Sequence, residues 1–315
     1  TIRVDGRLAH ELSNGEIAFV GEQLVYQSVG SKLNIVGMTS GLVKDAYLIG
    51  GQVMFTEQGI KAISGMDNAV TVFRADKAGT LTEIAKVFST EKPVTMYGKD
   101  VKEFTAQMIP SKGATPADLA SVRQSFGQEG SSFAKVTYSE LNGAGKAQFA
   151  KDLAAQFAKK EGVEVNDPRT TAYVNAVLGN KEQLGIFKTA GAGGEANYQL
   201  LGVSQEIILT HFKSAAQVDQ QHKKDYGPNT VTTFSLSLNP DKPAESPIQW
   251  SMNRSTMSEA GKAKFDHMIK ESFMKAEKLN PANPADQAKA AAFMRDVLAN
   301  RSGLGMVGSV GQKDV

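Results

Sequence analysis

The first 75 residues alternate between short apolar runs and glycine-containing breaks. The runs are rich in β-branched and aromatic residues, and pairs such as Asn14-Gly15 and Gly50-Gly51 separate them. This combination of runs and turn-forming pairs predicts β-strands. Because a hairpin needs only a short turn, whereas a parallel crossover needs a dozen or more residues, we expect antiparallel pairing. The predicted strands cover residues 17–20, 23–29, 33–38, 46–49, 52–55 and 69–73.

From residue 80 the apolar positions follow a helical spacing. Leu81, Ile84, Ala85 and Phe88 form one apolar face, which predicts a short helix that ends before Pro93. Farther along the chain, residues 115–118 read Thr-Pro-Ala-Asp. They supply an N-cap, a proline at the first helical position and an acid in the first turn, so a second helix is predicted over residues 116–126.

The second half of the chain contains one sequence pattern twice. Residues 145–149 read Gly-Lys-Ala-Gln-Phe, and residues 261–265 read Gly-Lys-Ala-Lys-Phe, 116 positions later. Residues 177–181 and 297–301 match at an offset of 120, so the second copy has four extra residues, placed most simply in the turn at 281–284. Two matches in the same order indicate an internal duplication rather than chance similarity between alanine-rich helices.

Each copy predicts two helices followed by a strand. Apolar side chains of the first helix fall on one stripe in both copies, at Phe149, Leu153 and Phe157 and again at Phe265, Ile269 and Phe273. We expect each stripe to pack against the second helix, and the Leu-Gly-Ile or Leu-Gly-Met segment after that helix to continue as a strand.

One more helix and two strands are predicted between the copies. Ser204 is a plausible N-cap for a helix that continues to Tyr226. Residues 231–238 alternate between two faces as a strand does, and residues 248–250 follow three prolines as a further strand. The only tryptophan, Trp250, is interpreted as a core or interface anchor rather than a platform for a ligand.

Together these elements predict an α+β fold. A mainly antiparallel β region is followed by two related helix-rich modules with short flanking strands. The expected divisions are a β-rich region at 1–110, the first module at 111–200, and a linking helix and strand with the second module at 201–315.

Composition narrows the classes of function. Lys and Arg number 35 against 33 Asp and Glu, for a net charge of +2. There is no clustered basic face, so a nucleic-acid partner is not expected. The chain has no cysteine and four histidines, none at the i, i+4 spacing of a helical zinc pair, so neither a metal nor another cofactor is expected. We interpret the four histidines as ordinary surface or half-buried residues.

The ends and the hydropathy add a little more. No apolar run approaches the ~20 residues that cross a bilayer, and no signal peptide is recognised, so a soluble protein in the cytoplasm or on a virus particle is expected. Thr1 could act as an N-terminal nucleophile with Lys32 as activator, but nothing else in the chain supports such a hydrolase.

The best candidate for chemistry is the segment around Lys188. This lysine ends a predicted strand, and the loop that follows contains Gly191, Gly193 and Gly194, whose amides could hold a phosphate. Glu206, eighteen residues beyond Lys188, has the separation of the lysine and glutamate in kinase-like folds. The loop follows the lysine instead of preceding it, and the second copy has Gly308 at the position of Lys188, so a plain turn is the competing interpretation.

Two other features are weaker. Residues 142–147 lie between a strand and a helix, as a P-loop does, but the first glycine of that motif would fall at Glu140, so we interpret them as the start of the repeated helix. The carboxylates are scattered, and no linear spacing selects an acid pair.

Three functions follow as expectations. The first is a non-catalytic structural or assembly protein that associates with itself or with other proteins, such as a component of a phage or virus particle. The second is a nucleotide- or phosphate-binding enzyme that uses the Lys188 loop. The third is a secreted bacterial effector that binds a host protein.

Overall fold

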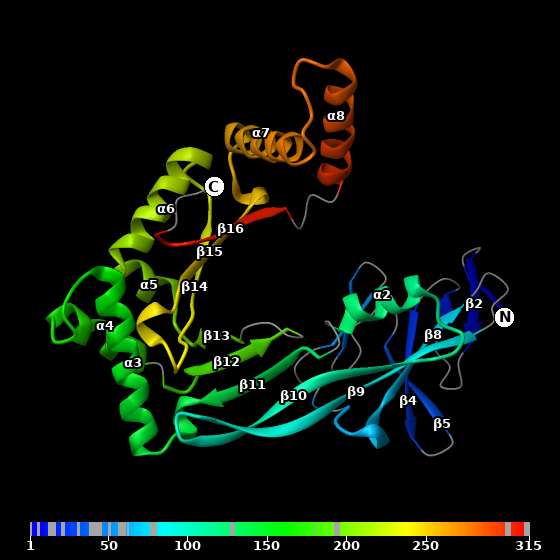
Figure 1. Ribbon diagram of the computed structural model, residues 1–315, viewed down its shortest axis with the longest axis horizontal. Helices are drawn as coiled ribbons and strands as arrows, with labels where there is room; N and C mark the ends of the chain where they lie inside the picture. Colours follow the sequence, from blue (N-terminus) through cyan, green and yellow to red (C-terminus); the bar gives the residue numbers. More distant parts are fainter. Residues whose placement is uncertain are drawn as a thin grey trace. The chain divides into compact units, whose positions relative to one another are not determined.

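The structure is a computed structural model (Figure 1). It describes the backbone alone for parts of the first 60 residues, and the backbone with most side chains beyond them. The described residues are 2–4, 7–11, 17–19, 23–29, 32–37, 46–49, 52–55, 61, 63–75, 81–126, 130–179, 181–191, 196–299 and 304–311.

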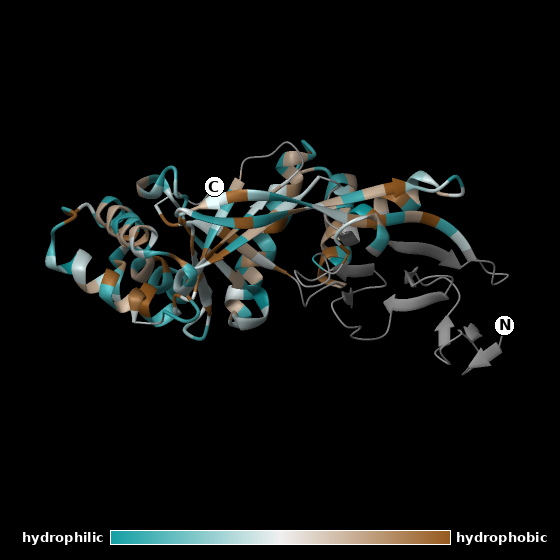
Figure 2. Ribbon diagram, turned by 90° about the horizontal axis from the view of Figure 1, so that it is seen from below, coloured by the Kyte–Doolittle hydropathy of each residue, from teal (hydrophilic) through white to brown (hydrophobic). Residues whose placement is uncertain are grey.

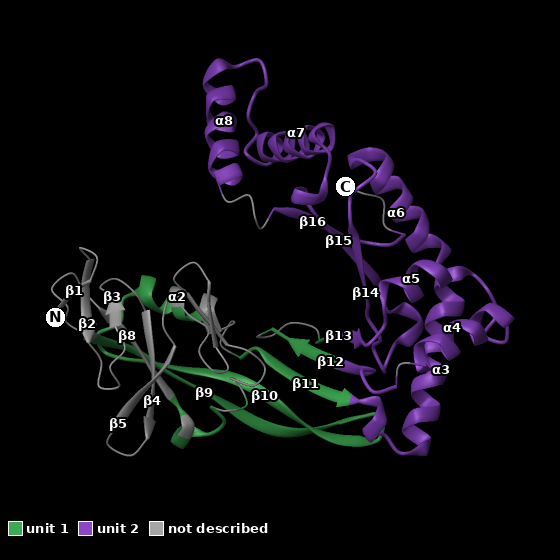
Figure 3. Ribbon diagram, turned by 180° about the vertical axis from the view of Figure 1, so that it is seen from behind, with its two compact units in different colours: residues 1–136, 187–197 green, residues 137–186, 198–315 purple. Residues whose placement is uncertain are grey.

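The chain divides into two compact units (Figure 3). Residues 1–136 and 187–197 form the first, and residues 137–186 and 198–315 form the second. This is a division by contacts. The three regions predicted from the sequence, 1–110, 111–200 and 201–315, are drawn from the sequence repeat and not from contacts. They stay a prediction.

The N-terminal part of the chain consists of antiparallel strands. Every pairing that is resolved among them is antiparallel, as the short spacings predict. The predicted α+β fold is therefore confirmed. The strands are β1 Ile2–Val4, β2 Arg7–Glu11, β3 Ile17–Phe19, β4 Gln23–Val29, β5 Lys32–Gly37, β6 Ala46–Ile49, β7 Gln52–Phe55, β8 Val70–Ala75, β9 Leu81–Met96 and β10 Lys99–Pro110.

The predicted helix after residue 80 is wrong, because this segment is the long strand β9. The pairing of β9 with β8 shifts register between Val72 and Phe73, which leaves Ile84 as an extra residue on β9. Such a bulge changes the face on which alternate residues lie, so Ile84 and Ala85 are both buried. The resulting apolar spacing imitates that of a helix. Pro93 lies beyond the residues of β9 that pair with β8 and opposite Lys102 of β10, a position where a proline is tolerated.

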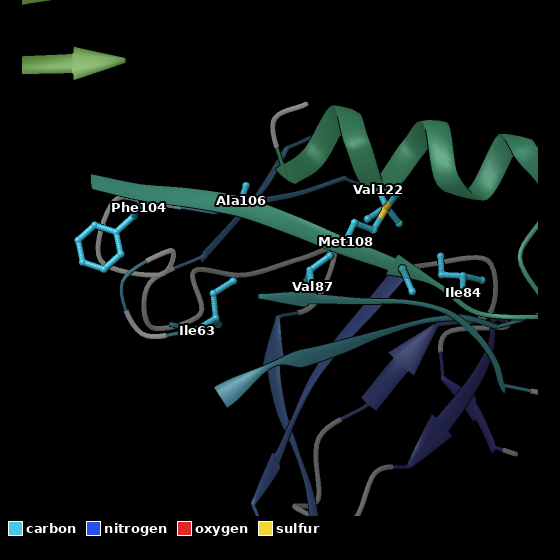
Figure 4. Close-up of a cluster of buried hydrophobic side chains, with 8 residues drawn as sticks. Ile63, Ile84, Val87, Phe104, Ala106, Met108 and Val122 are labelled. Carbon is cyan, nitrogen blue, oxygen red and sulfur yellow. The ribbon is translucent and has the colours of Figure 1, made fainter. Parts of the chain in front are cut away.

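The helix predicted from Thr115 is present as α2, Pro116–Phe126. The Thr115 hydroxyl accepts a hydrogen bond from the Asp118 amide, and the Asp118 carboxylate accepts one from the Thr115 amide, which together close the first turn. Val122 of α2 packs onto β9 and β10 in the core of the first unit (Figure 4). That core comprises Ile63, Ile84, Ala85, Val87, Phe104, Ala106, Met108 and Val122.

The rest of the chain contains the predicted helical modules and a second sheet. Its elements are β11 Ser132–Thr137, α3 Gly143–Glu161, α4 Pro168–Leu178, β12 Gly185–Ala190, β13 Ala196–Leu201, α5 Gln205–His211, α6 Lys213–Tyr226, β14 Thr232–Leu236, β15 Ile248–Asn253, α7 Glu259–Ala276, α8 Pro284–Ala299 and β16 Gly305–Ser309. One sheet has the order β13-β12-β11-β10-β9-β8-β4-β5, and a second has the order β14-β15-β16.

The sequence repeat is also a repeat of structure. The order β11, α3, α4, β12 recurs as β15, α7, α8, β16. Asn142 and Ser258 each cap the first helix by accepting a hydrogen bond from the amide three residues on. A backbone hydrogen bond joins the end of the first strand to the start of the last strand in both copies. The Tyr138 amide donates to the Leu184 carbonyl, and the Arg254 amide donates to the Leu304 carbonyl, at 2.9 Å each.

An aromatic stack joins the two helices of each copy. Phe157 stacks on Tyr173 with ring centroids 4.9 Å apart. Phe273 stacks on Phe293 with centroids 3.9 Å apart. Figure 2 shows hydrophobic residues distributed among hydrophilic ones along the helices, as amphipathic helices require. The duplication therefore preserves the packing as well as the sequence.

The four extra residues do not lie in the turn where we predicted them. Both second helices begin at a proline, Pro168 and Pro284, at the earlier offset of 116. The helix α8 has 16 residues and α4 has 11, so the insertion lengthens α8 itself. Four residues are close to one helical turn of about 3.6 residues, so the same face still packs after the insertion.

The single helix predicted over residues 204–226 is two helices. Ser204 caps α5 as predicted, but the backbone is extended at Phe212 before α6 begins. The Glu161 carboxylate, at the end of α3, accepts hydrogen bonds from the amides of Lys213 and Ser214. The N-terminus of α6 thus receives its capping group from a distant part of the chain.

Candidate functional site

The second sheet has one covered face and one open face. Even-numbered residues of β14 and β15 point to the covered side and are buried, whereas odd-numbered residues point outward. Two large hydrophobic side chains are exposed on the open side, Val231 at 55% and Val307 at 82%. The covered side comprises Thr232, Phe234, Leu236, Ile248, Trp250 and Met252. The alternation predicted for residues 231–238 holds through Leu236, whereas Ser237, predicted on the open side, is buried.

Trp250 lies in the middle of the covered side. It is 4% exposed, and its ring meets the His222 ring of α6 edge to face at 4.5 Å. Gly308 of β16 pairs with Trp250, and a Cβ atom at Gly308 would collide with the indole ring. The glycine at the position of Lys188 therefore gives the tryptophan room to lie across β16. The imidazole of His222 lies 3.0 Å from the Thr232 hydroxyl. This histidine is 4% exposed, so the prediction of a surface or half-buried residue is wrong for it.

The open side is a shallow surface that mixes apolar and hydroxyl-bearing side chains. A hollow of about 460 Å³ lies over the ends of the strands, with Val231, Thr233, Ser251 and Val307 in its lining. No charged side chain belongs to that lining. A neutral, half-apolar and shallow surface favours contact with another protein surface over capture of a small charged ligand.

The two edges of this sheet differ. On β14, the Gln205 carboxamide accepts from the Phe234 amide and donates to the Phe234 carbonyl at 2.6 and 2.7 Å. Nearby, Leu238 donates to the Tyr198 carbonyl. On β16, in contrast, no strand in the described part of the chain pairs with the outer edge (Figure 1).

Lys188 lies in β12, where its ammonium group contacts a buried carboxylate. Its Nζ donates to Oε1 of Glu103 at 2.7 Å, and Lys92 Nζ lies 2.9 Å from Oε2 of the same residue. The Glu103 side chain is 3% exposed. Burial alone raises the pKa of Glu103, but hydrogen bonds from Lys188 and Lys92 outweigh it, and the pKa is lowered overall.

The other residues of the predicted phosphate site are not assembled around Lys188 by any contact described. Gly191 is exposed after β12, and Glu206 is exposed in the first turn of α5, in the other compact unit. Gly193 and Gly194 lie outside the described residues. The phosphate site stays a prediction, whereas the contact of Lys188 with Glu103 is a finding. Glu103 escaped the sequence analysis because a single glutamate in a strand has no distinguishing spacing.

The segment 142–147 is the start of α3. The Asn142 side chain accepts from the Gly145 amide at 2.8 Å, and Lys146 lies over the Tyr138 ring. Among the described residues, no group of three or more His, Asp or Glu side chains is placed to hold a metal ion. None of the helices that are described is both long and apolar enough to cross a membrane.

Comparison with known proteins gives no match. No family model, no curated protein and no solved structure is similar to this chain.

Proposed function

We propose that this chain is a non-catalytic structural or assembly protein that acts through contacts with other protein chains, its own copies included. The observation that supports this best is the second sheet, where Val231 and Val307 are exposed on an uncharged, shallow open side. Exposed hydrophobic surface of this kind marks sites of protein association. A phage or virus particle is the setting that we propose for it.

The surroundings of Lys188 agree with a structural role. A phosphate would have to compete with Glu103 for the ammonium group, and Glu103 sits in a buried position that favours its existing partners. We therefore rank a nucleotide- or phosphate-binding enzyme below the assembly protein. If Lys188→Ala abolished the thermal stabilisation given by a nucleotide, the order of the two would reverse.

Co-purification tests the proposal directly. Two differently tagged copies of the chain, expressed together, should be recovered in one complex when either tag is used for capture. Mixing the two after separate purification provides the matched comparison, because reversible association exchanges copies. Recovery of a single tag in both experiments, at high protein concentration, would contradict self-association.

A further inference from the structure

The hydrogen-bonding pattern of β16 leaves one set of backbone groups facing away from the sheet. The Arg254 amide donates to the Leu304 carbonyl, and the Val310 amide donates to the Ile248 carbonyl. The register then makes the even-numbered residues of β16 the ones whose backbone groups form hydrogen bonds with β15. In an antiparallel ladder the intervening residues direct their amide and carbonyl groups to the opposite side. Gly305, Val307 and Ser309 therefore present their polar backbone groups to the outer edge.

The first copy of the repeat shows what occupies the equivalent edge. There β12, the counterpart of β16, lies between β11 and β13. Residues 191–195 join β12 to β13, which is too short a link for a parallel crossover, so β13 runs antiparallel to β12. The second copy has β15 beside β16 and no described strand on the other side. The repeat thus predicts an added antiparallel strand beside β16.

The sequence of β16 suits pairing with a second β16. It reads Gly-Met-Val-Gly-Ser, without the proline or charged residue that usually protects an edge strand. A twofold axis at Val307 would place Val307 opposite its own copy and Gly305 opposite Ser309. All three are residues with outward backbone groups, so the pairing would form about six backbone hydrogen bonds.

We propose that two copies of this chain associate through an antiparallel pair of β16 strands, centred on Val307, which joins the two second sheets into one. This deepens the proposed function and rests on it, because it names the surface through which self-association occurs. The exposed Val307 side chains would then lie side by side on the open faces. The interface is short, so the dimer should form reversibly and depend on protein concentration.

Cysteine substitution tests the register, because the chain has no cysteine of its own. In the proposed pair the Cα atoms of the two residues at position 307 are about 5.5 Å apart, within the range of roughly 4.4–6.8 Å that a disulfide needs. Diamide should oxidise the two thiols of V307C to a disulfide-linked dimer. S309C is the matched control on the same strand, since its two copies would be separated by about 13 Å along the pair. V231C controls for random collision at an exposed valine.

The result expected is rapid formation of a covalent dimer by V307C and only slow, collisional cross-linking by S309C and V231C. Equal rates for the three variants, or a faster reaction of S309C, would overturn the proposed pairing. If tagged copies of the wild-type chain co-purify while V307C fails to cross-link, the edge pairing fails and the assembly function stands. If the tagged copies do not co-purify, both fail.

A second variant protects the test against misfolding. The Val307 amide faces away from β15, so V307P removes one outward hydrogen-bond donor without breaking the pairing within the chain. V307T keeps both the amide and a β-branched side chain. We expect V307P to lose the wild-type dimer and V307T to keep it, with unfolding temperatures of both variants close to that of the wild type. A V307P dimer of unchanged affinity would contradict the proposal.

Discussion

At the scale of single residues, the carboxylate of Glu103 is a buried charge held between two lysines. Two lysines hold it, and their side chains differ in exposure, at 18% for Lys188 and 65% for Lys92. The pKa of Glu103 is lowered because the hydrogen bonds from these lysines outweigh the opposing effect of burial. A group whose pKa is lower in the folded state contributes stability above its unfolded pKa and loses that contribution as the pH falls.

Glu103→Gln should therefore destabilise the protein near neutral pH. We expect a loss of about 1–3 kcal/mol in the free energy of unfolding, because the partly buried Lys188 ammonium loses its charged partner. Urea unfolding at pH 7 and at pH 3 measures this. The difference from wild type should shrink below pH 4.5, the ordinary pKa of the group, because the carboxylate takes up a proton first in the unfolded chain and, at lower pH, in the folded one. An equal difference at both pH values would show that charge is not the cause.

Gly308→Ala tests the close approach of Trp250 to β16. The added methyl group would collide with the indole ring, so the ring must move or the strand must separate. We expect a loss of about 1–3 kcal/mol in chemical denaturation, the usual cost of overpacking. Gly191→Ala is the control, because among the described residues no atom outside its chain neighbours lies within 4 Å of the Cβ position there. If the two variants were equally stable, the glycine would not be required for packing.

At the scale of elements, the sequence correctly predicts the strands and helices whose ends are set by neighbouring turn and cap residues. Strands β4, β6 and β7 occur at the predicted residues, and α2 begins at its predicted cap. Errors arise where a distant contact decides the outcome. The bulge at Ile84 depends on the pairing of β9 with β8, and the break at Phe212 depends on the Glu161 carboxylate.

For the candidate sites too, some features could be predicted from the sequence and others could not. The repeat in the sequence locates β16 and its unusual Gly308, because equivalent positions can be compared directly. Neither the open edge nor the partner of Lys188 could be read from spacing. Both depend on which strands become neighbours, and that is set by the tertiary fold.

The repeat also predicts the effect of one substitution. Tyr173 and Phe293 occupy equivalent stacks, but Tyr173 carries a hydroxyl that is fully buried without a hydrogen-bond partner among the described residues. Burial raises the pKa of this phenol, as expected for a group that water does not reach. Tyr173→Phe should keep the stack and leave stability unchanged or increase it by about 1 kcal/mol. A clear loss in thermal unfolding would reveal a partner for the hydroxyl.

At the scale of the whole molecule, the duplication explains why one sheet is left incomplete. The two copies of a strand, two helices and a strand share a helix cap, a hydrogen bond at the strand ends and an aromatic stack, yet among the described residues only the first copy is continued by a further strand, β13. Duplication of a module also duplicates its strand edges, and an unprotected edge favours pairing with another chain. The self-association that we propose would thus follow from how the fold is built.

The most direct test of self-association is the mass in solution, measured by light scattering over a wide range of protein concentration. One chain has a mass of 33.7 kDa. The account predicts a mass that rises with concentration toward at least twice this value, and a V307P variant that stays at the mass of one chain. A wild-type mass of 33.7 kDa at every concentration would contradict it.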